Sequence, residues 1–193
     1  DDVLFTFDGM KEATIFYERL VARLAEFDLA VNEAKTRIIP CGSRIARAFA
    51  KEGKEMPTFS FLGFLHFWGQ SKNRQRNEIF WRMKRQTDPM RFRKKLLEIK
   101  MHLMKHRHNK ELIPYAISIA KGYMNYFAVN DNLHRIKLFL NAVKRLLFRA
   151  LNRRSQKRSF TWERFHKILD LNGYPKASIL VNLFFESKSY SMK

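Results

Sequence analysis

The sequence Gln86-Thr87-Asp88-Pro89-Met90 separates two kinds of hydrophobic pattern in this chain of 193 residues. Before it, apolar side chains alternate or form short aromatic runs, which favours strands. After it, they recur every three or four residues, which is typical of helices with one buried face. Asp88 is a good helix N-cap, and proline is favoured at the first helical position. We therefore predict an α+β fold that changes type near residue 87.

The part before the switch is predicted to hold antiparallel strands with a helix. Strand patterns occur at residues 3–7, 29–31, 36–39, 59–67 and 78–83. The last two are predicted to form a hairpin with a basic tip. A helix is predicted for residues 10–27, and one helical turn within the loop of residues 43–58. Residues 1–87 form the first predicted domain.

The part after the switch, residues 88–193, is predicted to be a helical bundle. Its predicted helices cover residues 89–107, 110–127, 131–153, 161–170 and 178–185. The third of them starts from an Asp131 cap. Its expected buried stripe consists of Leu133, Ile136, Leu140, Val143, Leu147 and Ala150.

Charge is distributed unevenly along the chain. The formal net charge is +20, from 38 Lys and Arg against 18 Asp and Glu. Residues 1–60 carry 9 basic and 10 acidic side chains, whereas residues 61–193 carry 29 basic and 8 acidic, a net +21. Because like charges repel, this excess favours a polyanionic partner, whose association releases bound counterions. We therefore predict that the later part binds nucleic acid.

Composition argues against several other classes. There is no run of about 18 apolar residues and no aromatic belt, so we expect no membrane partner. Cys41 is the single cysteine, which excludes an internal disulfide framework and any multi-cysteine zinc module. A lone cysteine fits a reducing compartment, and we expect a cytoplasmic protein.

Two adjacent carboxylates, Asp1 and Asp2, open the chain. No initiator Met or signal peptide precedes them, so we expect the chain to be a piece of a larger protein. Paired aspartates can hold two divalent metal ions about 3.5 to 4 Å apart, which stabilise the attacking and leaving oxygens of phosphoryl transfer. An Asp-Asp pair also arises often by chance, so its context has to decide.

That context consists of short motifs in a fixed order. After the aspartates come Asn32-Glu33-Ala34-Lys35-Thr36, then Phe59-Ser60-Phe61-Leu62-Gly63-Phe64, then Arg153-Arg154-Ser155-Gln156-Lys157, and finally Thr161-Trp162-Glu163-Arg164-Phe165. This order resembles the reverse transcriptases of group II introns, and the likeness covers nearly the whole chain. In that family the aspartate pair closes a Tyr-x-Asp-Asp hairpin, whose Tyr-x half would precede Asp1.

The resemblance implies an RNA-directed DNA polymerase that uses Mg²⁺, with Mn²⁺ as an alternative. Its partners would be an RNA template, a DNA primer, a deoxynucleoside triphosphate and structured intron RNA, whose splicing a maturase assists. Residues 1–87 would be the C-terminal part of the palm and residues 88–193 the thumb. Asp1 and Asp2 would be catalytic, with Asp1 a metal ligand. The family needs another palm aspartate and fingers residues, so we expect this chain alone to be inactive.

The candidate nucleic-acid contacts are Lys35, Phe61, Leu62, Gly63, Arg91, Lys94, Lys95, Arg153, Arg154, Lys157 and Arg158. Lys35 is either an ordinary exposed lysine or lies near the nucleotide or template. Gly63 indicates a bulge or a close backbone approach, which would leave room for the primer. The last four residues either bind phosphate or cap a helix end through its dipole. Phosphate contacts would position a duplex without reading its sequence.

Two alternatives remain open. His102, His106 and His108 could suggest a metal site, but no nearby Cys or acidic pair completes it, so we expect them to be polar surface. The alternative to a polymerase is a non-catalytic RNA-binding protein, a maturase remnant whose bundle clamps structured RNA. No Cys-rich or His-Asn-His segment of an appended nuclease follows the bundle.

Overall fold

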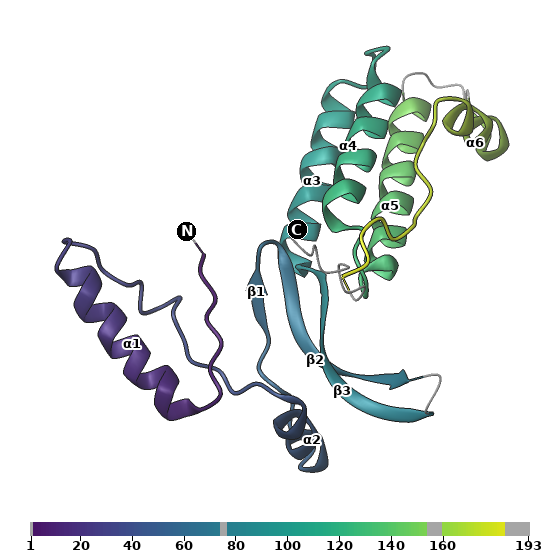
Figure 1. Ribbon diagram of the computed structural model, residues 1–193. Coiled ribbons are helices and arrows are strands. Elements are labelled where there is room, and N and C mark those ends of the chain that lie inside the picture. Colours follow the sequence, from purple (N-terminus) through teal and green to yellow (C-terminus); the bar gives the residue numbers. More distant parts are fainter. Residues whose placement is uncertain (1, 74–76, 154–159, 184–193) are drawn as a thin grey trace, which may run out of the picture. The chain divides into compact units, whose positions relative to one another are not determined.

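The computed structural model describes residues 2–73, 77–153 and 160–183, shown in Figure 1. These residues form six helices and one three-stranded sheet, so the predicted α+β class is confirmed. The chain divides into two compact units. Asp1–Leu62 and His66–Lys84 form the N-terminal unit, and Gly63–Leu65 and Arg85–Lys193 form the helical unit. The functional division at residues 87 and 88 stays a prediction.

The sheet consists of two consecutive hairpins. Strands β1 (Phe59–Phe61), β2 (Phe64–Asn73) and β3 (Glu78–Thr87) lie in the order β1-β2-β3. Such short connections can join only antiparallel neighbours. The predicted hairpin is present between β2 and β3, but residues 59–67 are not the single strand predicted, because a turn at Leu62 and Gly63 divides them into β1 and the start of β2. The strands of the hairpin are longer than predicted, because β2 continues into the polar residues 69–73, which had been predicted as part of the turn.

The predicted strands at residues 3–7, 29–31 and 36–39 are wrong, since these residues are not in strands. Phe5 and Phe7 alternate because both rings pack against Phe16 of helix α1 (Met10–Ala25), with ring centroids 4.6 and 5.0 Å apart. Residues 32–36 form a turn, in which the carbonyl of Asn32 accepts hydrogen bonds from the amides of Lys35 and Thr36. The alternating apolar residues at 3–7 therefore reflect packing against helix α1, not a place in a sheet.

Helix α2 (Ser43–Lys51) is longer than the single turn predicted for this region. Its end has the left-handed geometry of a Schellman motif, with Gly53 at a φ of +68°. The amide of Gly53 donates to the carbonyl of Ala50, and that of Lys54 to the carbonyl of Phe49. Gly53 was the signal in the sequence that could have marked this helix end.

Helices α3 (Pro89–Lys105), α4 (Leu112–Phe127), α5 (Leu133–Asn152) and α6 (Trp162–Leu171) form the helical unit. Asp88 caps α3 as predicted: its carboxylate accepts hydrogen bonds from the amides of Met90 and Arg91. The predicted Asp131 cap of α5 is wrong, because Asn132 is the N-cap while Asp131 has a φ of +69°. All members of the predicted α5 stripe are buried except Leu133, which is half-buried.

The helix predicted for residues 178–185 is wrong over residues 178–183, and residues 184 and 185 lie outside the described part. This segment is extended and lies along α5, as the yellow trace in Figure 1 shows. The amides of Leu180 and Val181 donate to the carbonyl of Ala128, and Val181 forms a parallel bridge with Val129. Four residues before this segment, the buried hydroxyl of Tyr174 donates to the carbonyl of Leu140 of α5 at 2.8 Å. These contacts replace the helix.

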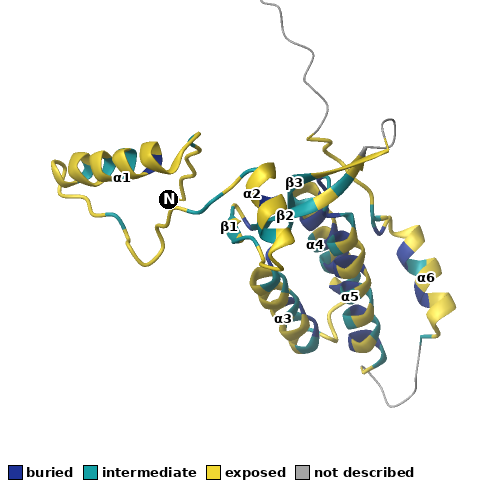
Figure 2. Ribbon diagram, turned by 90° about the horizontal axis from the view of Figure 1, so that it is seen from below, coloured by how far each residue is buried: buried dark blue, intermediate teal, exposed yellow. Residues whose placement is uncertain are grey.

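Burial differs sharply between the two units, as Figure 2 shows. In the helical unit the core includes Ile99, Leu103, Phe139 and Leu147, all completely buried. Among the described residues of the N-terminal unit, only Ala13 and Ala46 are buried. Because apolar burial is the main stabilising contribution to folding, the helical unit should be the more stable one.

We predict that backbone amides of α1 exchange with solvent on the order of a hundredfold faster than those of α5, because α1 opens without disrupting a core. Hydrogen exchange followed by mass spectrometry measures both helices in the same sample, so α5 is the internal reference. Equal protection of α1 and α5 would contradict this difference in local stability.

Candidate nucleic-acid interface

A tight turn joins β1 to β2 at two of the predicted contact residues. Leu62 and Gly63 have φ values of +48° and +78°, the left-handed pair that a two-residue type I′ turn requires. Leu62 is 55% exposed, whereas Gly63 is buried. A Cβ atom on Gly63 would lie 3.4 Å from the Phe127 ring and 3.7 Å from Nη1 of Arg91. The close approach predicted for Gly63 is therefore present.

Asp88 connects this turn to the start of α3. Its amide donates to the carbonyl of Gly63 at 3.0 Å. Its carboxylate accepts hydrogen bonds from the amides of Met90 at 2.8 Å and of Arg91 at 3.0 Å. A carboxylate at a helix N-terminus is also favoured by the helix dipole. One buried residue thus fixes the backbone of Gly63 and Arg91, two predicted contact residues.

Behind Asp88 lies a buried polar cluster that the sequence patterns did not reveal. It consists of Thr87, Tyr123 and Asn132, which are 1%, 8% and 0% exposed. The Asn132 oxygen accepts from the Thr87 amide at 2.8 Å, and its nitrogen donates to the Thr87 hydroxyl and the Phe127 carbonyl, both at 2.9 Å. The Tyr123 hydroxyl donates to the Thr87 hydroxyl at 3.0 Å. Burial raises the pKa of Tyr123 to about 12.

Helix α3 exposes cations around a row of apolar side chains. Arg91, Lys94 and Lys95 are exposed as predicted, and Lys95 lies 3.4 Å from the carboxylate of Glu98. The row between the cations was not predicted: Met90, Leu97 and Met101 are 75%, 55% and 65% exposed. Their spacing puts them opposite the buried face that contains Ile99 and Leu103. The sequence spacing of Met90, Leu97 and Met101, which places them on the same helix face as the basic residues, could have predicted this row.

Further exposed cations come from α5 and α6. They are Lys137, Arg145, Arg149 and Arg153 around α5, and Arg164 and Lys167 on α6. Arg153 is the C-cap residue of α5, and its guanidinium lies 4.0 Å from the sulfur of Met104. The other predicted members of that cluster, Arg154, Lys157 and Arg158, lie outside the described residues.

Asn152 closes the connection between α5 and α6. Its side-chain oxygen accepts from the Phe160 amide at 2.9 Å, and its nitrogen donates to the Phe160 carbonyl at 3.2 Å. Thr161 then caps α6, since its hydroxyl accepts from the amide of Arg164. The two helices are therefore joined by a bidentate contact outside the Arg-Arg-Ser-Gln-Lys motif.

The predicted catalytic and nucleotide residues lie in the N-terminal unit. Asp1 is outside the described residues, and Asp2 is exposed in an extended segment before α1. Lys35 is exposed in the turn of residues 32–36, and Phe61 is half-buried at the end of β1. Throughout the described part, no group of three or more His, Cys, Asp or Glu side chains gathers in a way that could hold a metal.

The three histidines considered as a metal site, His102, His106 and His108, lie among aromatic and polar side chains near the end of α3. His102 stacks on Tyr115, with ring centroids 3.9 Å apart, and His106 lies 4.5 Å from His102. Partial burial, followed by the charges of His106 and Lys105, lowers the pKa of His102. His108 accepts a hydrogen bond from Arg107 at 3.2 Å. The stack on Tyr115 gives His102 a packing role.

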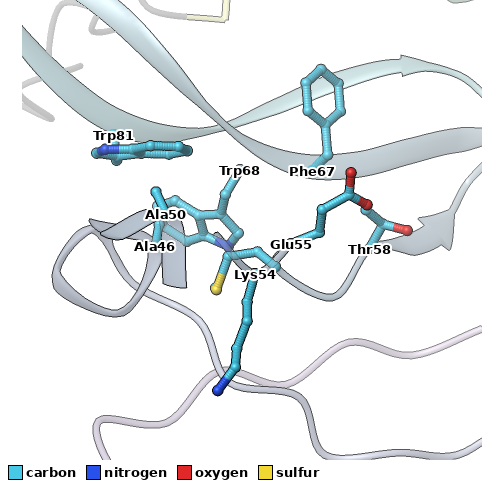
Figure 3. A pocket seen from close by; sticks show the side chains of 9 residues that line it. Ala46, Ala50, Lys54, Glu55, Thr58, Phe67, Trp68 and Trp81 are labelled. Atoms are coloured by element: carbon cyan, nitrogen blue, oxygen red, sulfur yellow. The ribbon is translucent and has the colours of Figure 1, made fainter. Parts of the chain in front are cut away.

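A hollow of about 310 Å³ lies between α2 and the sheet of the N-terminal unit, as Figure 3 shows. Trp68 and Trp81 form one wall and Ala46 of α2 faces them. Lys54 lies at its rim and pairs with Glu52 at 2.8 Å. None of the predicted site residues lines this hollow.

No family model, curated protein or solved structure matches the chain. Within the described residues, no helix combines the length and the apolar character needed to cross a bilayer.

We predict that Tyr123→Phe lowers the unfolding free energy by about 1 kcal/mol at neutral pH, because it removes the hydrogen bond to Thr87. The pKa of the Tyr123 phenol is about 10 in the unfolded chain and about 12 in the folded protein. Between these pH values the unfolded chain loses its proton first, so the unfolding free energy of the wild type falls as pH rises. Tyr123→Phe has no phenol to ionise, so the difference in unfolding free energy between wild type and variant should shrink above pH 10. Denaturant unfolding at several pH values measures it. A difference that stays constant up to pH 12 would contradict the buried, hydrogen-bonded phenol.

Proposed function

We propose that this chain grips an RNA template and DNA primer as part of an RNA-directed DNA polymerase of the group II intron type. In this proposal residues 1–87 are the end of the palm and residues 88–193 are the thumb. Asp1 and Asp2 belong to the catalytic site, with Asp1 a ligand of Mg²⁺ or Mn²⁺. A role in folding structured intron RNA, as a maturase, belongs to the same proposal.

The observation that carries the proposal is the exposed cationic surface of the helical unit. Arg91, Lys94 and Lys95 reach solvent from a helix whose buried face, with Ile99 and Leu103, packs into the hydrophobic core. Exposed cations on rigid helices attract phosphates at fixed positions. Met90, Leu97 and Met101 form an exposed apolar row among these cations. Such a row could contact the sugar rings of a duplex while the cations contact its phosphates. This combination supports nucleic acid over a small polyanion.

The β1–β2 turn supports the same proposal. Gly63 presents a backbone without a side chain, and Leu62 is exposed beside it in the turn. Through Asp88, this backbone is held at a fixed distance from the start of α3. Gly63 is buried, and its missing side chain leaves room for the guanidinium of Arg91, whose Nη1 lies 3.7 Å from the Cβ position, so the turn helps to position this proposed phosphate contact.

A second candidate function is RNA binding without catalysis. One observation favours it: the helical unit has a core of its own, containing residues from α3 to α6 and Tyr174. Such a unit needs no contribution from the aspartates to stay folded or to present its cations. The two candidates differ in chemistry rather than in binding, so they need separate experiments.

We predict that replacing Arg91, Lys94 and Lys95 by Gln weakens binding to an RNA–DNA duplex about tenfold to a hundredfold. The slope of log affinity against log salt should become shallower by about one per residue, because each phosphate contact releases counterions. Fluorescence anisotropy at several salt concentrations measures both quantities.

The matched control replaces Arg44, Arg47 and Lys51 of α2, which are also exposed and carry the same charge. We expect this variant to retain most of the affinity and the slope. Equal losses in both variants would mean that net charge alone drives binding, and would contradict a defined interface on α3.

We predict that Asp2→Asn in the native protein reduces primer extension on an RNA template at least about a hundredfold, because a carboxylate at the metal site is lost. Duplex affinity should change less than about twofold, since electrostatic binding depends on the helical unit. Asp8→Asn is the control, as Asp8 is also exposed and lies in the same segment before α1.

Undiminished extension by Asp2→Asn would contradict a catalytic role for the aspartate. If the native protein binds the duplex and extends no primer, the polymerase proposal is wrong and the non-catalytic candidate is correct.

A further inference from the structure

Helices α5 and α6 meet in a stack of aromatic rings. Phe148 of α5 and Trp162 of α6 are nearly parallel, at 12°, with ring centroids 3.9 Å apart. The buried ring of Phe165 meets both rings edge-on, at 5.3 Å from Phe148 and 5.7 Å from Trp162. His166 lies 5.7 Å from Trp162 at a tilt of 30°. Phe148, Trp162 and His166 are called the aromatic platform below.

Trp162 is 45% exposed, although tryptophan is a large apolar residue. Phe148 occupies one face of its indole ring, so the accessible area belongs to the other face and the ring edge. The contacts with Phe148 and Phe165 fix the ring before any ligand arrives. A flat aromatic surface that is held in place loses little conformational entropy when another flat ring stacks on it.

Both helices that contribute to the platform also carry exposed cations. Arg145 lies three residues before Phe148 and therefore on the same face of α5, and Arg149 follows Phe148 directly. Arg164 and Lys167 are exposed on α6. Glu163 is the exposed carboxylate next to Trp162 in the sequence, and it points about 100° away around the helix. By the same geometry, Arg164 and Lys167 point about 200° and 140° away from Trp162, so the cations on the side of the platform are Arg145 and Arg149 of α5.

We infer that the aromatic platform stacks an unpaired base of RNA on Trp162, while the neighbouring arginines contact the flanking phosphates. Bases in a regular duplex are stacked on each other, so a platform at the protein surface selects a base from a loop, bulge or single-stranded end. Every base has a flat face, so the contact would tolerate sequence variation. This inference rests on the proposed nucleic-acid binding and adds the kind of nucleotide that the α5–α6 end recognises.

Charge decides between a base and an apolar peptide side chain as the occupant. A peptide that inserts an aromatic residue gains from Trp162 alone, whereas a nucleotide also satisfies Arg145 and Arg149. Arginine side chains beside an aromatic surface are the usual combination in binding sites for single-stranded nucleic acid. The surface therefore fits a nucleotide better than a peptide.

The test compares two RNA probes with the full chain: a fully paired duplex, and the same duplex with a single-stranded 3′ extension that carries 2-aminopurine. Wild type should bind the extended probe about tenfold more tightly than the duplex, a typical effect of one stacked base. Stacking should also quench the 2-aminopurine fluorescence. Trp162→Leu should abolish both effects while duplex affinity changes less than about twofold, because phosphate contacts remain.

Two variants control this test. Trp162→Phe keeps a flat ring and should retain most of the preference and the quenching. Leu171→Ala removes another exposed apolar side chain of α6, 87% exposed, and should behave as wild type. Thermal unfolding shows whether Trp162→Leu keeps its fold. If this variant does not fold, the fluorescence quenching by wild type and by Trp162→Phe still tests whether a base stacks on the ring.

Equal binding of both probes by wild type, or an undiminished preference in Trp162→Leu, would overturn the inference while duplex binding upholds the proposed function. If wild type binds neither probe at low salt, both the inference and the proposed function are wrong. These two failures are therefore distinguishable.

Discussion

The side-chain amide of Asn132 holds together three parts of the helical unit. It bonds to Thr87 at the end of β3, to the carbonyl of Phe127 at the end of α4, and it belongs to the residue that begins α5. Asn132 is completely buried, so each lost partner would leave a polar group without water, at about 1 to 3 kcal/mol. The geometry of the adjacent Asp88 cap, and through it the spacing of Gly63 and Arg91, depends on this amide.

The helical unit combines a well-packed core with a surface that repels itself. Its cations reach solvent from α3, α5 and α6, while residues such as Phe139 and Leu147 are completely buried. Burial of apolar area stabilises the bundle by enough to tolerate this repulsion, which a bound polyanion would relieve. Binding should therefore also stabilise the fold, by mass action on the native state. Among the described residues of the N-terminal unit, Ala13 and Ala46 are the buried ones, so apolar burial stabilises this unit much less.

Helical periodicity was a good guide to the bundle because each helix buries one continuous face. The N-cap at Asp88 and four of the helices in residues 88–171 were predictable from periodicity and capping residues alone. Short apolar runs were a poor guide, because residues 3–7 and 178–183 can satisfy the same pattern in other ways. Phe5 contacts a helix, and Val181 pairs with Val129 across a distance in sequence that no local window covers.

The candidate interface shows the same limit. The exposure of the α3 cations could be predicted from their spacing relative to the buried face. The close approach at Gly63 could be predicted because a glycine interrupts a run of aromatic residues. The cluster of Thr87, Tyr123 and Asn132 could not be predicted, because it joins residues up to 45 positions apart through hydrogen bonds. The exposure of Trp162 was equally hidden, since tryptophan in an amphipathic helix normally lies in the core.

Asn152 has a consequence for how this protein can vary. Its amide forms two hydrogen bonds with the backbone of Phe160, so the start of α6 is positioned by residues on either side of the connecting segment. The placement of α6 against α5 therefore depends on the contact between Asn152 and Phe160 rather than on the number of residues that separate them. The chain can change the number of basic residues at this point independently of the architecture that carries them.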